Sequence, residues 1–124
     1  MNLVDSSAWL EYFADGPNAP EFSRPIEAVS RLVVPTILIY EVFKRVLAQL
    51  GEDLALEAIA LMQQGQIVDL DVSLSLQAAK IGAALKLPMA DSIILATARA
   101  NSATIWTQDS DFRGIEGVRF FAKK

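Results

Sequence analysis

Apolar and polar residues follow one another along the chain in blocks whose period changes from strand-like to helix-like. Short apolar runs bounded by turn residues predict strands, and five such runs occur, at 1–5, 32–35, 66–70, 103–107 and 118–122. Longer segments with apolar residues three or four positions apart predict helices, and these occupy 6–16, 36–50, 52–65, 73–87 and 90–102. Strands therefore alternate with helices long enough to cross over between parallel strands.

The expected helices carry recognisable boundaries. The first has Ser6 or Ser7 as its expected N-cap, and we expect Trp9, Leu10 and Phe13 on its buried face. Gly51 and Pro88 end the helices at 36–50 and 73–87. The helix at 73–87 also has apolar residues at core spacing, namely Leu74, Ala78, Ile81 and Leu85.

The sequence predicts one stretch without regular secondary structure. Gly16 to Pro25 contains three prolines and predicts a break in secondary structure. A short helix is expected only after it, at 25–31. With no linker or repeat, the pattern predicts a single domain over 1–124, built on a parallel sheet with helices on both faces.

The apolar content is high for so short a chain. Of its 124 residues 52% are hydrophobic and the mean hydropathy is +0.32, yet no run is long enough for a membrane-spanning helix. We expect the surplus in a dimer or partner interface, and the segment 52–65, apolar around much of its circumference, is the first candidate. The N-terminus meets Asp5 without a preceding basic region, so a cytoplasmic location is expected.

The chain contains no His and no Cys. This excludes disulfides, cysteine nucleophiles, histidine general bases and the usual structural zinc site. Glycine-rich phosphate loops are missing as well. Carboxylates remain as the main chemical resource, and they favour Mg²⁺ or Mn²⁺. The net charge of −4 argues against binding nucleic acid by bulk electrostatics, although it allows a local basic rim.

Four acids are expected at one edge of the sheet. Asp5 and Asp109 end the first and fourth expected strands, Glu41 lies in the first turns of a helix, and Asp91 opens another. Because helices that return between parallel strands begin where the strands end, all four belong to the carboxyl edge. Each acid alone has an ordinary explanation: Asp5 and Asp91 suit helix caps, Glu41 suits a pair with Arg45, and Asp109 suits a turn.

The convergence of the four acids favours function. Their mutual repulsion requires protons or cations, and bound Mg²⁺ or Mn²⁺ both neutralises them and lowers the pKa of a bound water. Hydrolysis of a phosphodiester is the reaction that such a site most naturally supports.

The chain resembles the PIN domain, and within it the VapC-like toxins of toxin–antitoxin pairs. The resemblance rests on VDSSAWLEYF, PTILIYEV, LPMADSIILATA and IWTQDSDF, in this order over nearly the whole length. It implies a three-layer α/β/α fold with a four- to five-stranded mainly parallel sheet. It also implies a Mg²⁺- or Mn²⁺-dependent endoribonuclease, a cognate antitoxin whose tail covers the acidic site, and a homodimer.

The resemblance assigns residues as well. Asp5, Glu41, Asp91 and Asp109 are the implied catalytic and metal-binding set, with Asp111 as a further ligand or an acid that acts through water. Ser7 and Thr107 match hydroxyl positions that orient acids or water. A phosphate-contacting rim has six candidates, each more often a simple solubilising charge: Lys44, Arg45, Lys80, Lys86, Arg99 and Arg113.

Two alternatives of other classes stay open at this point. A non-catalytic module would use the same acids to receive basic side chains of a partner. A receiver-like phosphoacceptor domain, with Asp71 after the third expected strand, fits the length and acidity but not the two consecutive helices between Thr36 and Gly65.

Overall fold

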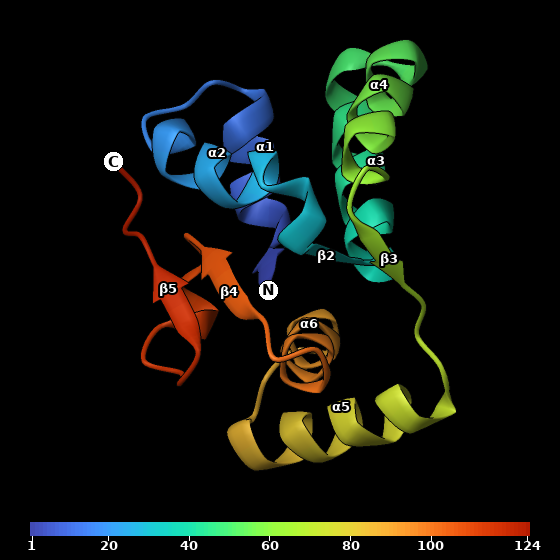
Figure 1. The fold of residues 1–124 in the computed structure, drawn as a ribbon, viewed down its shortest axis with the longest axis vertical. Coiled ribbons are helices and arrows are strands. Elements are labelled where there is room, and N and C mark those ends of the chain that lie inside the picture. Colours follow the sequence, from blue (N-terminus) through green and yellow to red (C-terminus); the bar gives the residue numbers. More distant parts are fainter.

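A computed structural model describes all of residues 1–124 and contains one five-stranded sheet (Figure 1). The strand order is β3-β2-β1-β4-β5, and every neighbouring pair is parallel. The strands are β1 (Asn2–Val4), β2 (Leu32–Pro35), β3 (Gln66–Val68), β4 (Thr104–Thr107) and β5 (Val118–Phe120). All five expected strands are therefore present, and the predicted parallel sheet is confirmed.

Helices cover both faces of the sheet. They are α1 (Ser6–Phe13), α2 (Ala19–Glu27), α3 (Thr36–Leu50), α4 (Glu52–Met62), α5 (Val72–Leu85) and α6 (Met89–Ala100). In Figure 1, α1 and α2 lie on one side of the strands and α5 and α6 on the other, while α3 and α4 form a packed pair beside β2 and β3. The three-layer α/β/α architecture is confirmed.

The core holds the central strands and α6 in place. Leu3 and Val4 of β1 and Ile105 of β4 are completely buried. In α6, every residue from Asp91 to Ala98 is buried. Helix α6 therefore lies inside the molecule, and its first turn presents Asp91 to the edge of the sheet from a rigid support.

The prediction for Gly16 to Pro25 was wrong, because α2 occupies most of it. Pro20 lies in the first turn of α2, where a backbone N–H has no partner within the helix, and Pro25 lies in the last turn. Burial of Phe22 and Ile26 stabilises the helix. The expected helix at 25–31 is instead the end of α2 followed by the 3₁₀ turn η1 (Val29–Arg31).

Two smaller expectations were also wrong. Asp5, rather than Ser6 or Ser7, caps α1, since its side chain accepts a hydrogen bond from the backbone N–H of Ala8. On α5, Leu74 and Ala78 are buried, whereas Leu85 at the end of the helix is 46% exposed.

Exposed large apolar side chains lie mostly on three helices, α3, α4 and α5. Leu54, Leu56 and Leu61 of α4 are exposed, as are Val72 and Leu76 of α5. The assignment of α4 as an interface stays a prediction. No single helix is long and apolar enough to cross a membrane, and α5 and α6, which reach that length only together, meet at an angle of 116°.

The strand order of the sheet differs from that of receiver domains, which disfavours the receiver-like alternative. Receiver domains have the flavodoxin-like order 2-1-3-4-5, in which β1 lies between β2 and β3. Here β1 lies between β2 and β4, and β3 is an edge strand. Asp71, the phosphoacceptor of that alternative, accepts the N–H of Leu74 at 2.8 Å as the N-cap of α5.

Candidate active site

Acidic side chains gather at the carboxyl edge of the two central strands. Asp5 directly follows β1, and Asp109 lies two residues beyond the end of β4, the neighbouring parallel strand. Asp91 lies in the first turn of α6 and Glu41 further along α3. The elements are therefore arranged so that acids distant in sequence approach one another, as the strand and helix pattern predicts.

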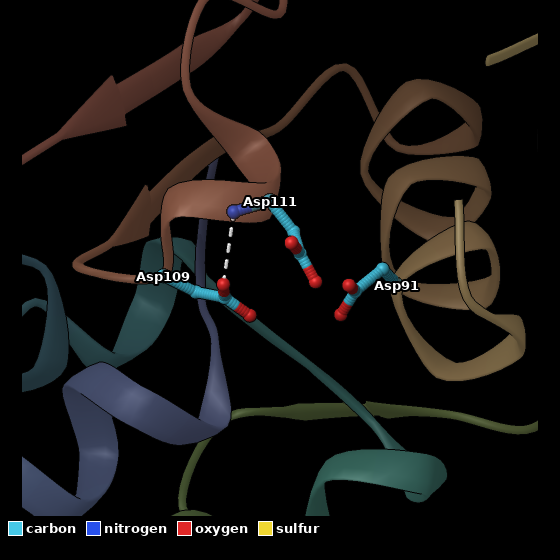
Figure 2. Close-up of side chains that lie close together, drawn as sticks. All are labelled: Asp91, Asp109 and Asp111. Carbon is cyan, nitrogen blue, oxygen red and sulfur yellow. Dashed lines mark hydrogen bonds between the residues drawn. The ribbon is translucent and has the colours of Figure 1, made fainter. Parts of the chain in front are cut away.

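Three carboxylates form the centre of this group, which we call the acid cluster: Asp91, Asp109 and Asp111. One oxygen from each lies within 4.8 Å of the others. Figure 2 shows Asp111 and Asp91 pointing toward each other from the 3₁₀ turn η2 (Ser110–Phe112) and from α6. The backbone N–H of Asp111 donates to Oδ1 of Asp109 at 2.9 Å, which fixes both residues in the turn.

Asp5, close enough to Asp91 and Asp109 for their charges to interact, is only 2% exposed. Its Oδ1 accepts from the Ser7 hydroxyl at 2.7 Å and from the Ala8 N–H at 3.1 Å. Its Oδ2 accepts from the Thr107 hydroxyl at 2.8 Å. Burial raises its pKa to about 6, the hydrogen bonds from Ser7, Thr107 and Ala8 oppose this rise, and the charge of Asp109 adds to it. Asp5 is therefore held rigidly but ionises reluctantly.

Thr107 connects the acids of the two central strands. Its Oγ1 donates to Asp5 and accepts the backbone N–H of Asp109 at 2.9 Å, and it lies 3.4 Å from the Ser7 hydroxyl. One buried hydroxyl thus sets the position of two carboxylates relative to each other.

Replacement of Thr107 by Val tests this positioning role. Thr107→Val keeps the shape but removes both hydrogen bonds, so we expect a loss of about 1–3 kcal/mol in the free energy of unfolding and roughly 10- to 100-fold weaker Mn²⁺ binding. Denaturant titration and calorimetry measure the two effects. Thr104→Val, at the start of the same strand, is the control. Equal effects of the two substitutions would contradict a role for the Thr107 hydroxyl in the site.

Burial and like charge shift the other acids in the same direction. Burial first, and then the neighbouring carboxyls of Asp111, Asp109 and Asp5, together raise the pKa of Asp91 to about 7. Burial also raises the pKa of Glu41, with the charge of Asp109 adding to the rise and the hydroxyl of Ser6 opposing it. Clustered acids whose pKa values are raised in this way are typical of functional sites.

Glu41 has an unsatisfied oxygen. Its Oε1 is buried and accepts no hydrogen bond. A buried carboxylate oxygen without a donor is costly and requires a proton or a cation. The expected alternative for Glu41, an exposed pair with Arg45, does not account for this buried oxygen.

The structure shows how far each ordinary explanation holds. Asp5 and Asp109 do cap α1 and the 3₁₀ turn, and these caps aim their carboxyls at the edge of the sheet. Asp91 is not the cap of α6, because Pro88 has that position. The cluster within 4.8 Å contains Asp111, whose role the sequence left undecided, while Asp5 and Glu41 lie outside it.

Three polar residues near the site were missed in the sequence. Ser6 acts on Glu41. Gln108 is buried next to Asp109, and its side-chain oxygen accepts from Nδ2 of Asn18 at 3.0 Å. The position of Gln108 between Thr107 and Asp109 was a usable signal. Asn18 lies within the segment expected to be irregular, and nothing in the sequence indicated a role for it near the site.

The acid cluster suits a hard divalent cation. Only oxygen donors are available, three carboxylates meet within 4.8 Å, and Oε1 of Glu41 lacks a partner. This donor set matches the preference of Mg²⁺ and Mn²⁺ for carboxylates.

Several solved structures are similar to this chain over almost all of its length. The toxin–antitoxin complex from Klebsiella pneumoniae contains a chain that superposes with a TM-score of 0.81 at 24% identity, over 100% of both chains. VapC20 of Mycobacterium tuberculosis, described as a sarcin-ricin loop cleaving toxin, has a TM-score of 0.77 at 15% identity, over 94% of this chain and 95% of that one. DNA-bound VapBC from Salmonella typhimurium gives 0.74 at 17%, over 98% of both chains.

These likenesses establish a shared fold. No protein with a curated function matches the sequence significantly. The sequence pattern of the PIN domain matches residues 3–118, a span that includes every acid discussed above. The chain therefore belongs to the PIN domain family.

Proposed function

We propose that the protein is a divalent-metal-dependent endoribonuclease, the toxin of a toxin–antitoxin pair. The observation that carries this proposal is the meeting of Asp91, Asp109 and Asp111 within 4.8 Å, in a chain that belongs to a family of nucleases. Solved structures with the same fold include a sarcin-ricin loop cleaving toxin and toxin–antitoxin complexes.

Asp91, Asp109 and Asp111 would hold Mg²⁺ or Mn²⁺, with Glu41 and Asp5 beside them. When bound, the cation supplies a water of lowered pKa and stabilises charge on the phosphoryl oxygens. In the reaction, the oxygen of water bonds to phosphorus and loses a proton, while the bond to the leaving ribose oxygen breaks and that oxygen takes up a proton.

The protein's own groups prepare the site. Ser7, Thr107 and the N–H of Ala8 fix both oxygens of Asp5. The hydrogen bond between the Asp91 and Asp111 carboxyls contributes to the raised pKa of Asp91, so Asp91 is partly protonated near neutral pH while no cation is bound. That proton must leave before both acids can act as ligands.

A cognate antitoxin is the proposed protein partner. A cavity of about 590 Å³ lies between α1, α3 and α4, lined by Leu10, Leu50, Leu54 and Leu61 and reaching Ser6 and Ser7 beside the acids. A partner segment with an apolar face would fill this cavity and extend toward the acid cluster. We also propose the homodimer and the cytoplasmic location as part of this function.

Cleavage of total cellular RNA tests the proposal. Purified protein in Mn²⁺ or Mg²⁺ is expected to produce discrete new RNA ends, because toxins of this kind cut few sites. The ends should be absent with a chelator and with Asp5→Asn/Asp91→Asn, as mapped by end sequencing.

The non-catalytic alternative predicts a different result. Unchanged RNA with wild-type protein in saturating metal, or cuts that persist in the double variant, would leave the acids as a docking site for a basic partner.

A further inference from the structure

A second cavity adjoins the acid cluster on the side of β5. It measures about 470 Å³ and begins at Ser7 and Asp109, which already belong to the candidate active site. From there its lining continues over Ser110 and Arg113 to Phe120 and Lys123. The cavity is therefore an extension of the acid site rather than a separate pocket elsewhere on the surface.

Its charge differs from that of the protein as a whole. The chain carries a net charge of −4, yet the lining of this cavity includes Arg113 and Lys123 against Asp109 as the only acid. When a cation occupies the acid cluster, Asp109 is neutralised and the cavity is cationic. A polyanion that approaches this acidic protein is attracted to this place.

Arg113 is also oriented. Its guanidinium carbon lies 5.6 Å from the centre of the Phe120 ring, within the range of a cation–π contact. Arg113 directly follows η2, the turn that holds Asp109 and Asp111. Two acids of the cluster, Asp109 and Asp111, and this cation thus belong to one short segment.

We propose that this cavity binds the RNA phosphate next to the scissile one, through Arg113 and Lys123. The inference rests on the proposed function. A strand whose scissile phosphate lies over the acids must place its neighbouring phosphate in an adjoining space, and this space offers two cations and the hydroxyl of Ser110. Phosphate contacts of this kind set the register of a strand without reading its sequence.

The test uses Arg113→Gln/Lys123→Gln in the full chain. The matched control is Arg24→Gln/Arg31→Gln, which removes two exposed charges outside the candidate rim, in the last turn of α2 and in η1 before β2. The probe is a fluorescent single-stranded RNA that spans the mapped cut, with Ca²⁺ as a non-activating cation. Two lost phosphate contacts are expected to weaken binding roughly 10-fold and to lower the slope of log Kd against log salt by about 1.

Metal binding and turnover complete the measurement. Mn²⁺ affinity by calorimetry should stay unchanged, and KM should rise with little change in kcat, because the cations position the strand and do not touch the reacting atoms. Wild-type protein that neither cuts nor binds RNA would overturn the proposed function and the inference with it. Wild-type protein that binds, with the double variant equal to its control, would overturn the inference alone. Weakened antitoxin binding with unchanged RNA affinity would also overturn it and assign the cavity to a protein segment.

Discussion

Asp91→Asn is expected to lower the rate of RNA cleavage by about 100- to 1000-fold, the usual cost of losing one electrostatic element of an active site. Asp91 lies at the centre of the acid cluster, where the carboxyls of Asp111, Asp109 and Asp5 all act on it. The amide keeps the size of the side chain but removes an anionic ligand. Single-turnover cleavage in saturating Mn²⁺ measures the rate, and calorimetry should show weaker Mn²⁺ binding.

While the activity of Asp91→Asn should fall, the stability of its metal-free form should rise. The substitution removes a buried group that must either retain a proton or repel its neighbours, so the metal-free variant is expected to unfold at a higher temperature than wild type near pH 8. Glu116→Gln is the matched control, since Glu116 is exposed in the loop before β5, at the other edge of the sheet. Equal activity of Asp91→Asn and wild type would remove the acid cluster from the mechanism, and loss of activity with loss of folding would leave the role of Asp91 unsupported.

The acids could be placed at one edge from the sequence because two regular features determine their positions. Parallel strands joined by helices must all end at the same edge, and Asp5 and Asp109 follow strands whose apolar runs are clear. The position of Asp91 follows from that of α6, whose eight consecutive buried residues begin with it. Periodicity and chain direction therefore determined the approximate location of the site.

The finer arrangement depended on contacts that periodicity does not describe. Asp111 joins the cluster because the turn after Asp109 bends its backbone N–H onto the Asp109 carboxyl. Asp5 and Glu41 lie outside the 4.8 Å group. The oxygens of Asp5 are held by Ser7, Ala8 and Thr107, and the position of Glu41 depends on how α3 packs. The helix α2 was missed because Pro20 lies in its first turn, where it removes no intrahelical hydrogen bond, and because burial of Phe22 and Ile26 offsets the hydrogen bond that Pro25 removes near the end.

Capping and chemistry proved to be compatible functions of one carboxylate. The caps formed by Asp5 and Asp109 use one oxygen of each residue, Oδ1, for nearby N–H groups. The other oxygen of Asp5 accepts from Thr107. No hydrogen bond within the turn occupies Oδ2 of Asp109 in the same manner, so this residue can be part of the turn and a ligand at once. The alternative between a structural and a chemical role was therefore not exclusive.

Stability of the metal-free protein is expected to fall as the pH rises from about 4 to 7. Burial raises the pKa of Asp5 from 3.8 to about 6 and that of Asp91 to about 7. Well below pH 4 these carboxyls are protonated in both the folded and the unfolded state. Above it the unfolded carboxyls ionise first, so the folded state binds more protons and loses stability up to its own pKa. For Asp5 alone the difference is on the order of 3 kcal/mol. With no His or Cys in the chain, few other groups titrate in this range.

Mg²⁺ or Mn²⁺ should reverse this dependence, because the cation binds the ionised acids of the folded state only. The increase in Tm that saturating metal produces is therefore expected to be small at pH 5 and to grow through pH 7, and RNA cleavage should decline on acidification over the same range. Thermal melts at several pH values, with and without metal, measure both trends. Asp5→Asn/Asp91→Asn is the control, and its metal-free stability should depend on pH much less than that of wild type between 5 and 7, with buried Glu41 as the remaining contributor. A wild-type protein whose stability rises over this interval without metal, or whose response to metal is the same at pH 5 and pH 7, would show that these acids are not the groups that bind the cation.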